Sequence, residues 1–497
     1  MGVIRRQGMK QSVVGFVGVG IGAINTLFVY PYCLSKTEFG LIMFLLSVTM
    51  LLVPFVYMGT NLLTVRYFPA FRDPDTGHRG MLTLLSTLLA VGLLLLTVVA
   101  LLFKPIIYGW YAPLEQQYLP WVLPLVALIA YANLLAQYGS NFLRIVIPSL
   151  FNELLVKLVL PALVGAYFFG WLPFDWIIYG LVVMYAFALL GNLWYLHRLG
   201  ELRYGNPWRF LREQVALRQE MSVYAGYGIV GSVSDRLATQ LDLTMVTSII
   251  DPAAAAVFRI GSLVGNVVEI PRKSMFRIIG PILSDRMDRG DRMEVLKLYQ
   301  KSSLTLLLAG LLVFGGIWVN VDSLFAIMPN GEEYRAARFV ILLLGITNLV
   351  NMVTSINDSI IGFSKYFRWR FYFILLLGFL NIAFNYYLIP RYAIYGAAMA
   401  TLFTVTLYNF GKTLLIWVKM DLHPFTRETG FAVLIGAAAY LAAAYLPLPD
   451  MVWLELVVRS FLFASLFGGM VLAARLSPEV NQLPMIWWKK WRENRRP

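Results

Sequence analysis

The stretch that decides how the rest of the chain is interpreted covers residues 255–288 and reads AAVFRIGSLVGNVVEIPRKSMFRIIGPILSDRMD. It is long and apolar enough to cross a bilayer, yet charged side chains occur along its whole length. At 100° per residue, its polar residues fall within a sector of roughly 80° on one side of a helix. This cationic stripe consists of Arg259, Ser262, Asn266, Glu269, Lys273 and Arg277. It would be about 27 Å long, close to the thickness of the hydrocarbon core. Because an unpaired cation there costs about 3 kcal/mol, the stripe predicts a water-filled cavity or a charged partner.

The composition is that of a membrane protein. The chain has 497 residues, of which 59% are hydrophobic and only 14% are charged. Its mean hydropathy is +0.69. Soluble domains typically carry about 25% charged residues. Because only helices and closed barrels satisfy the backbone in lipid, long apolar segments predict membrane-spanning helices.

Hydropathy divides the chain into apolar segments of roughly twenty residues each. The segments of the first half lie at residues 12–32, 41–61, 82–103, 119–138, 150–169 and 176–196. The others lie at residues 223–250, 255–283, 303–321, 339–361, 371–389, 394–418, 431–446 and 452–474. The predicted fold class is therefore an all-α polytopic membrane protein with about 14 transmembrane helices. No connection is long enough for a globular domain, which places the function in or at the membrane.

The two halves of the chain resemble each other. Gly18 matches Gly228, and Asn141 matches Asn357, with an offset that drifts slowly along the sequence. Two six-helix lobes with an internal repeat are suited to alternating access. The predicted organisation is an N-terminal six-helix lobe (1–198), a cytoplasmic amphipathic linker (199–221), a C-terminal six-helix lobe (222–419), and two extra helices with a basic cytoplasmic tail (420–497).

The positive charge follows the topology of the segments. Lys and Arg gather in alternate connections and at both ends, including Arg5, Arg6 and the tail segment WWKKWRENRR. Under the positive-inside rule, both termini lie in the cytoplasm. Most of the net charge of +14 is thereby explained, so it does not indicate a nucleic-acid partner.

The sequence holds few residues for metal or redox chemistry. The single cysteine, Cys33, excludes an intramolecular disulfide and a cysteine cluster. The histidines are far apart, so we expect neither a metal site nor a cofactor. No catalytic residue is predicted.

Several carboxylates lie within the apolar segments. Asp235 and Asp242 are seven residues apart on one face of the 223–250 segment, Glu269 lies in the 255–283 segment, and Asp358 lies in the 339–361 segment. Ionisable residues at that depth predict either an ion pair with a neighbouring helix or a role in coupling to a proton or sodium gradient. Glu153 and Lys157, four residues apart, are expected to form an ion pair of their own.

Three segments carry a family resemblance: EFGLIMFLLSVTMLLVPFVYMGTNLLTVRYFPAF, YYLIPRYAIYGAAMATLF and FRIIGPILSDRMDRGD. They resemble segments of bacterial polysaccharide transporters, the oligosaccharide flippases of the multidrug/oligosaccharidyl-lipid/polysaccharide exporter superfamily. The resemblance implies two six-helix lobes around a central cavity and transport of undecaprenyl-diphosphate-linked oligosaccharide. Related lipid II flippases hold the diphosphate with cavity arginines. The resemblance therefore implies a cationic substrate site, for which Arg66, Arg236, Arg259, Lys273 and Arg277 are the candidates, with Asn266 beside them.

The expected function is that of a multi-pass flippase of the bacterial inner membrane for surface polysaccharide synthesis (O-antigen, capsule or exopolysaccharide). The expected partners are a lipid-linked oligosaccharide, membrane lipids and other polysaccharide assembly proteins, and the expected state is a monomer. A lipid II flippase and an ion-coupled multidrug exporter of the same fold are alternatives, although an exporter of cations would favour an acidic cavity. A membrane glycan polymerase or ligase is a third alternative, but the short outer connections offer none of the carboxylates or histidines such enzymes need.

Overall fold

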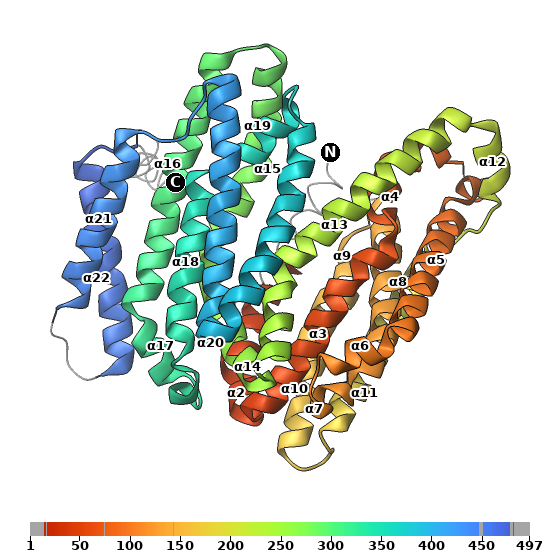
Figure 1. Cartoon of the computed structure of the whole chain (residues 1–497), viewed down its shortest axis with the longest axis horizontal. Helices are drawn as coiled ribbons and strands as arrows, with labels where there is room; N and C mark the ends of the chain where they lie inside the picture. Colours follow the sequence, from red (N-terminus) through yellow and green to blue (C-terminus); the bar gives the residue numbers. More distant parts are fainter. Residues whose placement is uncertain are drawn as a thin grey trace, which may run out of the picture. The chain divides into compact units, whose positions relative to one another are not determined.

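The computed structural model describes residues 14–15, 17–73, 75–142, 144–446, 451–477 and 481, and gives only the backbone at 235, 238, 273, 274, 276–278 and 281. The basic residues of the N-terminus and the basic tail therefore lie outside the described residues. Helices and turns make up the described residues, with no strand among them. This confirms the predicted all-α class (Figure 1).

Helices that are long and apolar enough to cross a membrane recur along the described chain. There are ten of them: Lys36–Phe71, His78–Leu102, Pro113–Ser140, Val146–Phe168, Asp175–Arg198, Pro252–Arg272, Arg292–Val319, Ala337–Phe363, Arg368–Met420 and Val452–Ala473. A shorter apolar helix covers Val17–Cys33. The chain is thus a multi-pass membrane protein, while the count of fourteen helices stays a prediction.

The chain divides into two compact units, Met1–Ala256 and Val257–Pro497, called here the N-terminal unit and the C-terminal unit. The lobe boundaries predicted from the repeat, on either side of residues 199–221, stay a prediction.

The N-terminal unit is built from helices joined by short turns. They are η1 (Asn25–Val29), α2 (Tyr30–Cys33), α3 (Lys36–Tyr57), α4 (Thr60–Phe71), η2 (His78–Gly80), α5 (Met81–Leu102), α6 (Lys104–Gly109), α7 (Pro113–Gln116), η3 (Leu119–Trp121), α8 (Val122–Ser140), α9 (Val146–Ser149), η4 (Leu150–Leu154), α10 (Leu155–Phe168), α11 (Asp175–Arg198), α12 (Pro207–Glu213) and α13 (Val215–Ile249). Helix α3 packs against α13, α8 and α5, and so forms the centre of this unit.

Local sequence explains where α3 begins and ends. Ser35 and Glu38 form a capping box at its N-terminus, which satisfies backbone N–H groups that the helix leaves free. At its C-terminus, Met58 and Gly59 adopt left-handed conformations with φ of 48° and 79°. A Cβ on Gly59 would lie 2.6 Å from the Cα of Ala225, so only glycine allows α13 to approach the α3–α4 junction this closely.

The C-terminal unit continues from α14 (Pro252–Asn266), which starts before the unit boundary. Its elements are η5 (Val267–Glu269), α15 (Ile270–Asp288), α16 (Arg292–Val319), α17 (Val321–Ile327), η6 (Gly331–Tyr334), α18 (Ala337–Val353), α19 (Asn357–Phe363), α20 (Arg368–Met420), α21 (Arg427–Ala444) and α22 (Val452–Ala473). Its core joins α16, α21 and α22, where Phe463 packs so closely on α16 that a Cβ on Gly315 would lie 2.1 Å from its ring.

The segment of the cationic stripe is helical but is not one regular α-helix. A 3₁₀ turn, η5, separates α14 from α15 directly before Pro271. Pro271 has no backbone N–H to donate and therefore favours a helix start at this point. Each 3₁₀ residue advances by about 120° instead of 100°, so the three residues of η5 turn the helix beyond it by about 60° relative to a regular α-helix.

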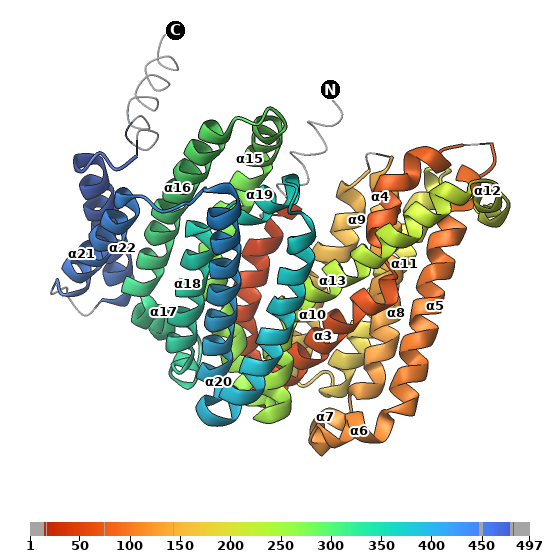
Figure 2. The ribbon, with the colours of Figure 1, turned by 45° about the horizontal axis from the view of Figure 1, so that its top comes forward.

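Helix α20 contains a reversal. Its 53 residues would extend about 80 Å if straight, more than twice the hydrocarbon thickness. Ala393, with φ 50° and ψ −133°, interrupts it shortly after Pro390. A Cβ on Gly396 would lie 2.2 Å from the carbonyl oxygen of Leu388, so the backbones of the two arms meet directly at the turn. The arms, cyan and light blue, run side by side in Figures 1 and 2.

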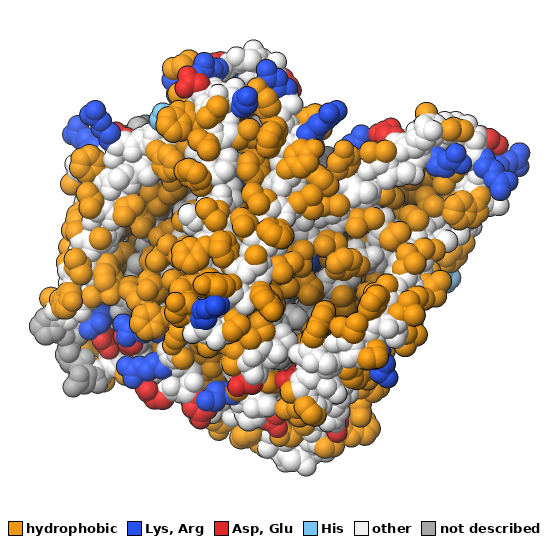
Figure 3. All heavy atoms as spheres, in the orientation of Figure 1, with side chains coloured by type: hydrophobic (Ala, Val, Ile, Leu, Met, Phe, Trp, Pro, Cys, Tyr) orange, Lys and Arg blue, Asp and Glu red, His pale blue; other side chains and the backbone are white. Residues whose placement is uncertain are grey.

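Apolar side chains cover the middle of the helices. Figure 3 shows hydrophobic side chains along the helical surfaces and most of the Lys, Arg, Asp and Glu side chains near helix ends. Large exposed hydrophobic residues such as Leu94, Phe187 and Phe379 are 63%, 62% and 69% exposed. Such faces are compatible with lipid and not with water.

Candidate functional site

Helix α13 is held against α3 and α4 by polar contacts along its length. Ser47 donates to the carbonyl of Gln240 at 2.9 Å and lies 3.0 Å from the hydroxyl of Thr244. At the start of α4, the side-chain amide of Asn61 donates to the hydroxyl of Ser232 at 3.0 Å. Hydrogen bonds between apolar helices fix their relative position because few alternative partners exist in lipid. These contacts set the place of Arg236, which lies one turn after Ser232.

A polar cavity of about 540 Å³ lies within the N-terminal unit. Elements α3, α4, α8, α9, η4 and α13 contribute to its wall. Its polar lining consists of Tyr57, Thr60, Asn61, Asn133, Gln137, Ser140, Ser149, Asn152, Glu153 and Arg236. An amide-rich and hydroxyl-rich wall of this kind offers both donors and acceptors to a polar ligand.

A chain of amides stiffens one side of this cavity. The Asn192 amide on α11 donates to the Asn152 carbonyl oxygen at 2.7 Å, and the Asn152 amide donates to Asn133 at 3.0 Å. The Asn133 amide in turn donates to the hydroxyl of Tyr57 at 3.0 Å. Asn152 belongs to the π-helical turn η4. Because π turns are commonly found at functional sites, this turn is a second reason to regard the cavity as a site.

Two charged side chains lie in the cavity wall. Arg236 is half-buried, and no hydrogen bond or ion pair joins its guanidinium to another described side chain. The same holds for the carboxylate of Glu153, which is exposed to the cavity. A guanidinium in such a wall is suited to an anionic ligand, to which it can form paired hydrogen bonds.

Arg66 lies elsewhere in the N-terminal unit. Its guanidinium donates to Glu220 at 3.0 Å and lies 4.3 Å from the ring centroid of Tyr224. The Tyr67 hydroxyl donates to the same carboxylate at 2.9 Å. The side chain of Arg66 is 51% exposed. The structure therefore places Arg66 in a cluster that joins α4 to α13, and not in the lining of the Arg236 cavity.

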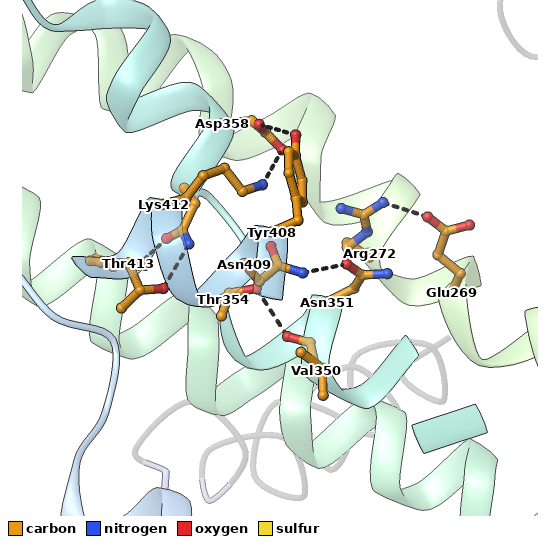
Figure 4. A network of polar contacts seen from close by, with 12 residues as sticks. Glu269, Arg272, Val350, Asn351, Thr354, Asp358, Tyr408, Asn409, Lys412 and Thr413 are labelled. Carbon is orange, nitrogen blue, oxygen red and sulfur yellow. Dashed lines mark hydrogen bonds and ion pairs between the residues drawn. The ribbon is translucent and has the colours of Figure 1, made fainter. Parts of the chain in front are cut away.

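A buried polar network occupies the C-terminal unit (Figure 4). Lys412 on α20 donates to Asp358 on α19 at 3.1 Å, and the Tyr408 hydroxyl donates to the other carboxylate oxygen at 3.1 Å. The Lys412 side chain is only 2% exposed. Its ammonium also lies 3.7 Å from the ring centroid of Tyr408. Asp358, predicted as a coupling residue or an ion-pair partner, is thus in an ion pair here.

The network extends through amides. Asn409 donates to Asn351 on α18 at 2.8 Å, and Asn357 donates to Thr413 at 2.9 Å. Figure 4 shows these groups beside the Asp358–Lys412 pair. Lys412 was not predicted from the sequence, because a single lysine in a long apolar segment is usually assumed to extend toward the interface. The available signal was that Asp358 and Lys412 are ionisable residues in separate apolar segments, and each needs a partner.

The cationic stripe is only partly described. Asn266 accepts a hydrogen bond from the Asn348 amide at 3.1 Å. Glu269 is in an ion pair with Arg272. The side chains of Lys273, Arg277 and Asp235 lie outside the described residues. Asp242 is buried and has further interactions, as does Arg259. A substrate role for each of these residues stays a prediction.

Among the described residues, no group of three or more His, Cys, Asp and Glu side chains is placed to hold a metal ion.

Comparisons with known proteins agree with this architecture. A family described as polysaccharide biosynthesis protein matches residues 9–285, more than half of the chain. No curated protein matches the sequence significantly. The fold is similar to that of the lipid II flippase MurJ in an inward closed conformation, with a TM-score of 0.72 at 11% identity, covering 94% of this chain and 99% of MurJ.

Two exporters share the fold. An inward-facing multidrug resistance transporter of the MATE family, in the MOP superfamily, is similar with a TM-score of 0.58 at 15% identity, covering 81% of this chain and 94% of that one. A MATE transporter from Vibrio cholerae is similar with a TM-score of 0.52 at 12% identity, covering 84% and 97%. The fold is therefore the one found in these flippases and exporters.

Proposed function

The chain belongs to the polysaccharide biosynthesis protein family, and from this premise we propose that it is a flippase for an undecaprenyl-diphosphate-linked oligosaccharide. The substrate would cross the bacterial cytoplasmic membrane to supply a surface polysaccharide such as O-antigen, capsule or exopolysaccharide. Both chain ends would lie in the cytoplasm, as the distribution of Lys and Arg predicts. The protein would act as a transporter and not as an enzyme.

The observation that carries the proposal is the polar cavity around Arg236. The Arg236 guanidinium is suited to the diphosphate, and the neighbouring amides of Asn133 and Asn152 are suited to sugar hydroxyls. The polyprenyl tail would stay in the lipid, where the apolar helix faces accept it. Alternating exposure of the head group to the two sides of the membrane would complete transport.

The remaining candidate residues have a defined place in this proposal. Arg259, Lys273 and Arg277 would add positive charge along the path of the head group. Asp235 and Asp242 are the candidates for coupling to a proton or sodium gradient. Asp358 would be a stabilising partner of Lys412 in the conformation described here.

The proposal is tested by transport into proteoliposomes. A lipid-diphosphate oligosaccharide with a fluorescent sugar is supplied on one side, and its appearance on the other side is measured by chemical quenching. Arg236→Gln is expected to reduce the rate at least tenfold, since charge-assisted hydrogen bonds are worth about 1.5–3 kcal/mol. Arg209→Gln is the matched control, because Arg209 lies on the surface helix α12 and is 88% exposed.

Full transport by Arg236→Gln would refute the role of the cavity. Joint neutralisation of Lys273 and Arg277 tests the stripe in the same assay, with membrane insertion measured separately. Supplying lipid II in place of the oligosaccharide lipid separates the two flippase activities, and a preference for lipid II would reassign the substrate.

A further inference from the structure

A second cavity of about 520 Å³ lies in the N-terminal unit, away from Arg236. It is formed by the α3–α4 junction with α4, α5, α12 and α13. Its wall is mostly apolar and includes Leu63, Leu84, Leu88, Leu211, Met221 and Ile229. This groove has no part in the function proposed above.

Helix α12 closes one side of the groove and is firmly placed. The side-chain oxygen Oδ1 of Asn206 accepts a hydrogen bond from the Trp208 backbone N–H at 3.0 Å, which caps the helix. Phe210 packs edge-on against Phe71 at 4.9 Å and under the guanidinium of Arg79 at 4.8 Å. The remaining side chains of this short helix are therefore held in fixed positions at the edge of the groove.

Two cations lie at the rim of the groove. Arg212 on α12 and Arg218 on α13 are exposed, and no hydrogen bond or ion pair joins either guanidinium to another described side chain. The nearby carboxylates are engaged elsewhere, Glu213 with Arg209 at 3.5 Å and Glu220 with Arg66 at 3.0 Å. The mouth of an apolar groove is therefore positively charged.

We propose that this groove binds an anionic glycerophospholipid, with an acyl chain against the apolar wall and the phosphate between Arg212 and Arg218. Guanidinium groups bind phosphate oxygens through paired hydrogen bonds, and basic pockets between membrane helices on the cytoplasmic side recognise anionic lipid head groups. Trp208, 48% exposed at the same rim, is the residue type that favours the head-group region.

The chemistry of the groove favours a lipid over other anions. A soluble phosphate would use the arginines but not the apolar wall. A polyprenyl tail is far longer than a groove of this volume can enclose. A phospholipid satisfies both parts of the site at once, and it is the molecule that surrounds α5 and α13 in a membrane.

The first test measures lipid retention by the purified full chain with native mass spectrometry, comparing phosphatidylglycerol with phosphatidylcholine of identical acyl chains. The wild type is expected to retain phosphatidylglycerol preferentially. The double variant Arg212→Gln, Arg218→Gln is expected to bind it about tenfold more weakly. The control Arg144→Gln, Arg198→Gln removes the same charge at two exposed positions of the N-terminal unit outside the groove and is expected to bind like the wild type. An equal loss of phosphatidylglycerol retention in both double variants would overturn the proposal. So would a wild type that retains phosphatidylglycerol no better than phosphatidylcholine.

The second test fills the groove without removing charge. Gly226 lines the groove, and a Cβ placed there meets no atom within 4 Å. Gly226→Leu is therefore expected to displace the acyl chain and lower retention while leaving the fold intact, whereas Gly165→Leu, also in open space, is expected to retain the lipid. Unchanged retention by Gly226→Leu would refute the groove as the chain site. Tighter binding of undecaprenyl phosphate than of phosphatidylglycerol, lost in the same variants, would overturn the proposal in favour of a substrate entry site.

Discussion

Removing the positive member of the buried pair should strongly destabilise the C-terminal unit. In Lys412→Met, the Asp358 carboxylate keeps the Tyr408 hydroxyl at 3.1 Å but loses an ammonium at the same distance. Methionine has a similar length to lysine and fills the same space, so the main change is electrostatic. The lysine side chain is 2% exposed and that of Asp358 is 29% exposed, so water replaces the lost partner poorly.

The expected size of the effect follows from the geometry. Two unit charges 3.1 Å apart attract by about 5 kcal/mol at an effective dielectric constant of about 20. Leaving one member of a buried pair without its partner typically costs about 3–5 kcal/mol. Because Tyr408 remains, we expect the lower end, about 3 kcal/mol. For a unit of this size, that loss corresponds to a fall in Tm of about 6–12 °C.

The assay is thermal unfolding of the purified protein in detergent, followed by intrinsic fluorescence. The double variant Asp358→Asn, Lys412→Met should recover most of the lost stability, because no charge then remains unpaired. Arg289→Met breaks the exposed pair with Asp285 and serves as the control, with little expected change. The electrostatic explanation would be contradicted if Lys412→Met lowered Tm by less than about 2 °C. It would also be contradicted if the double variant lost as much Tm as the two single variants added together.

Three further outcomes are expected. Gly40→Ala should lower the free energy of unfolding by about 1–3 kcal/mol or more, because the added Cβ would lie 1.7 Å from the carbonyl oxygen of Pro252. The control is Gly20→Ala, whose added Cβ meets no atom within 4 Å; it should be neutral or slightly stabilising in thermal unfolding. Asn152→Leu should lower the transport rate strongly and Tm only slightly, because it breaks the amide chain in the cavity wall. A fall in Tm without a loss of transport would count against this. Arg66→Gln should leave Tm nearly unchanged, since its ion pair is exposed, so that any loss of transport measured in proteoliposomes would report a role in binding.

Hydropathy predicts the long helices well, for a simple physical reason. The segment predicted at 82–103 is Met81–Leu102 in the structure, and the segment at 176–196 is Asp175–Arg198. A span needs about twenty apolar residues whatever its neighbours are, so the signal is local. The segments predicted at 371–389 and 394–418 likewise correspond to the two arms of α20.

The breaks within helices depend on packing and are not predicted by hydropathy. The linker helix predicted from NPWRFLREQVALRQ is instead divided between α12 and the start of α13. The expected ion pair of Glu153 and Lys157 is wrong, because the π turn η4 changes the helical spacing between them. Lys157 instead lies against the first helix, with its Nζ 3.2 Å from the position of a Cβ on Gly18. Gly18 and Gly22 have no side chain at these positions and so leave room for this approach.

The sequence predicts which types of residue form the candidate site, but not which of these residues lie together. The family resemblance makes Arg236 one of the candidate arginines from the sequence. The amides that accompany it, Asn133 and Asn152, come from other helices, and nothing in their own segments distinguishes them from amides that join helices. Arg66 and Arg236 are both arginines of apolar segments, and the structure separates them by placing Arg66 against Glu220 and Arg236 in the cavity wall.

The tight turn at Ala393 has a mechanical consequence for the C-terminal unit. Because the backbones of Leu388 and Gly396 are in direct contact there, the turn contains no spare length with which one arm of α20 could slide along the other. The arms can therefore separate only by opening about this turn, with the largest displacement at the ends near Arg368 and Met420. Lys412, close to one of these open ends, pairs with Asp358 and so ties the second arm of α20 to α19, the helix that precedes the first arm.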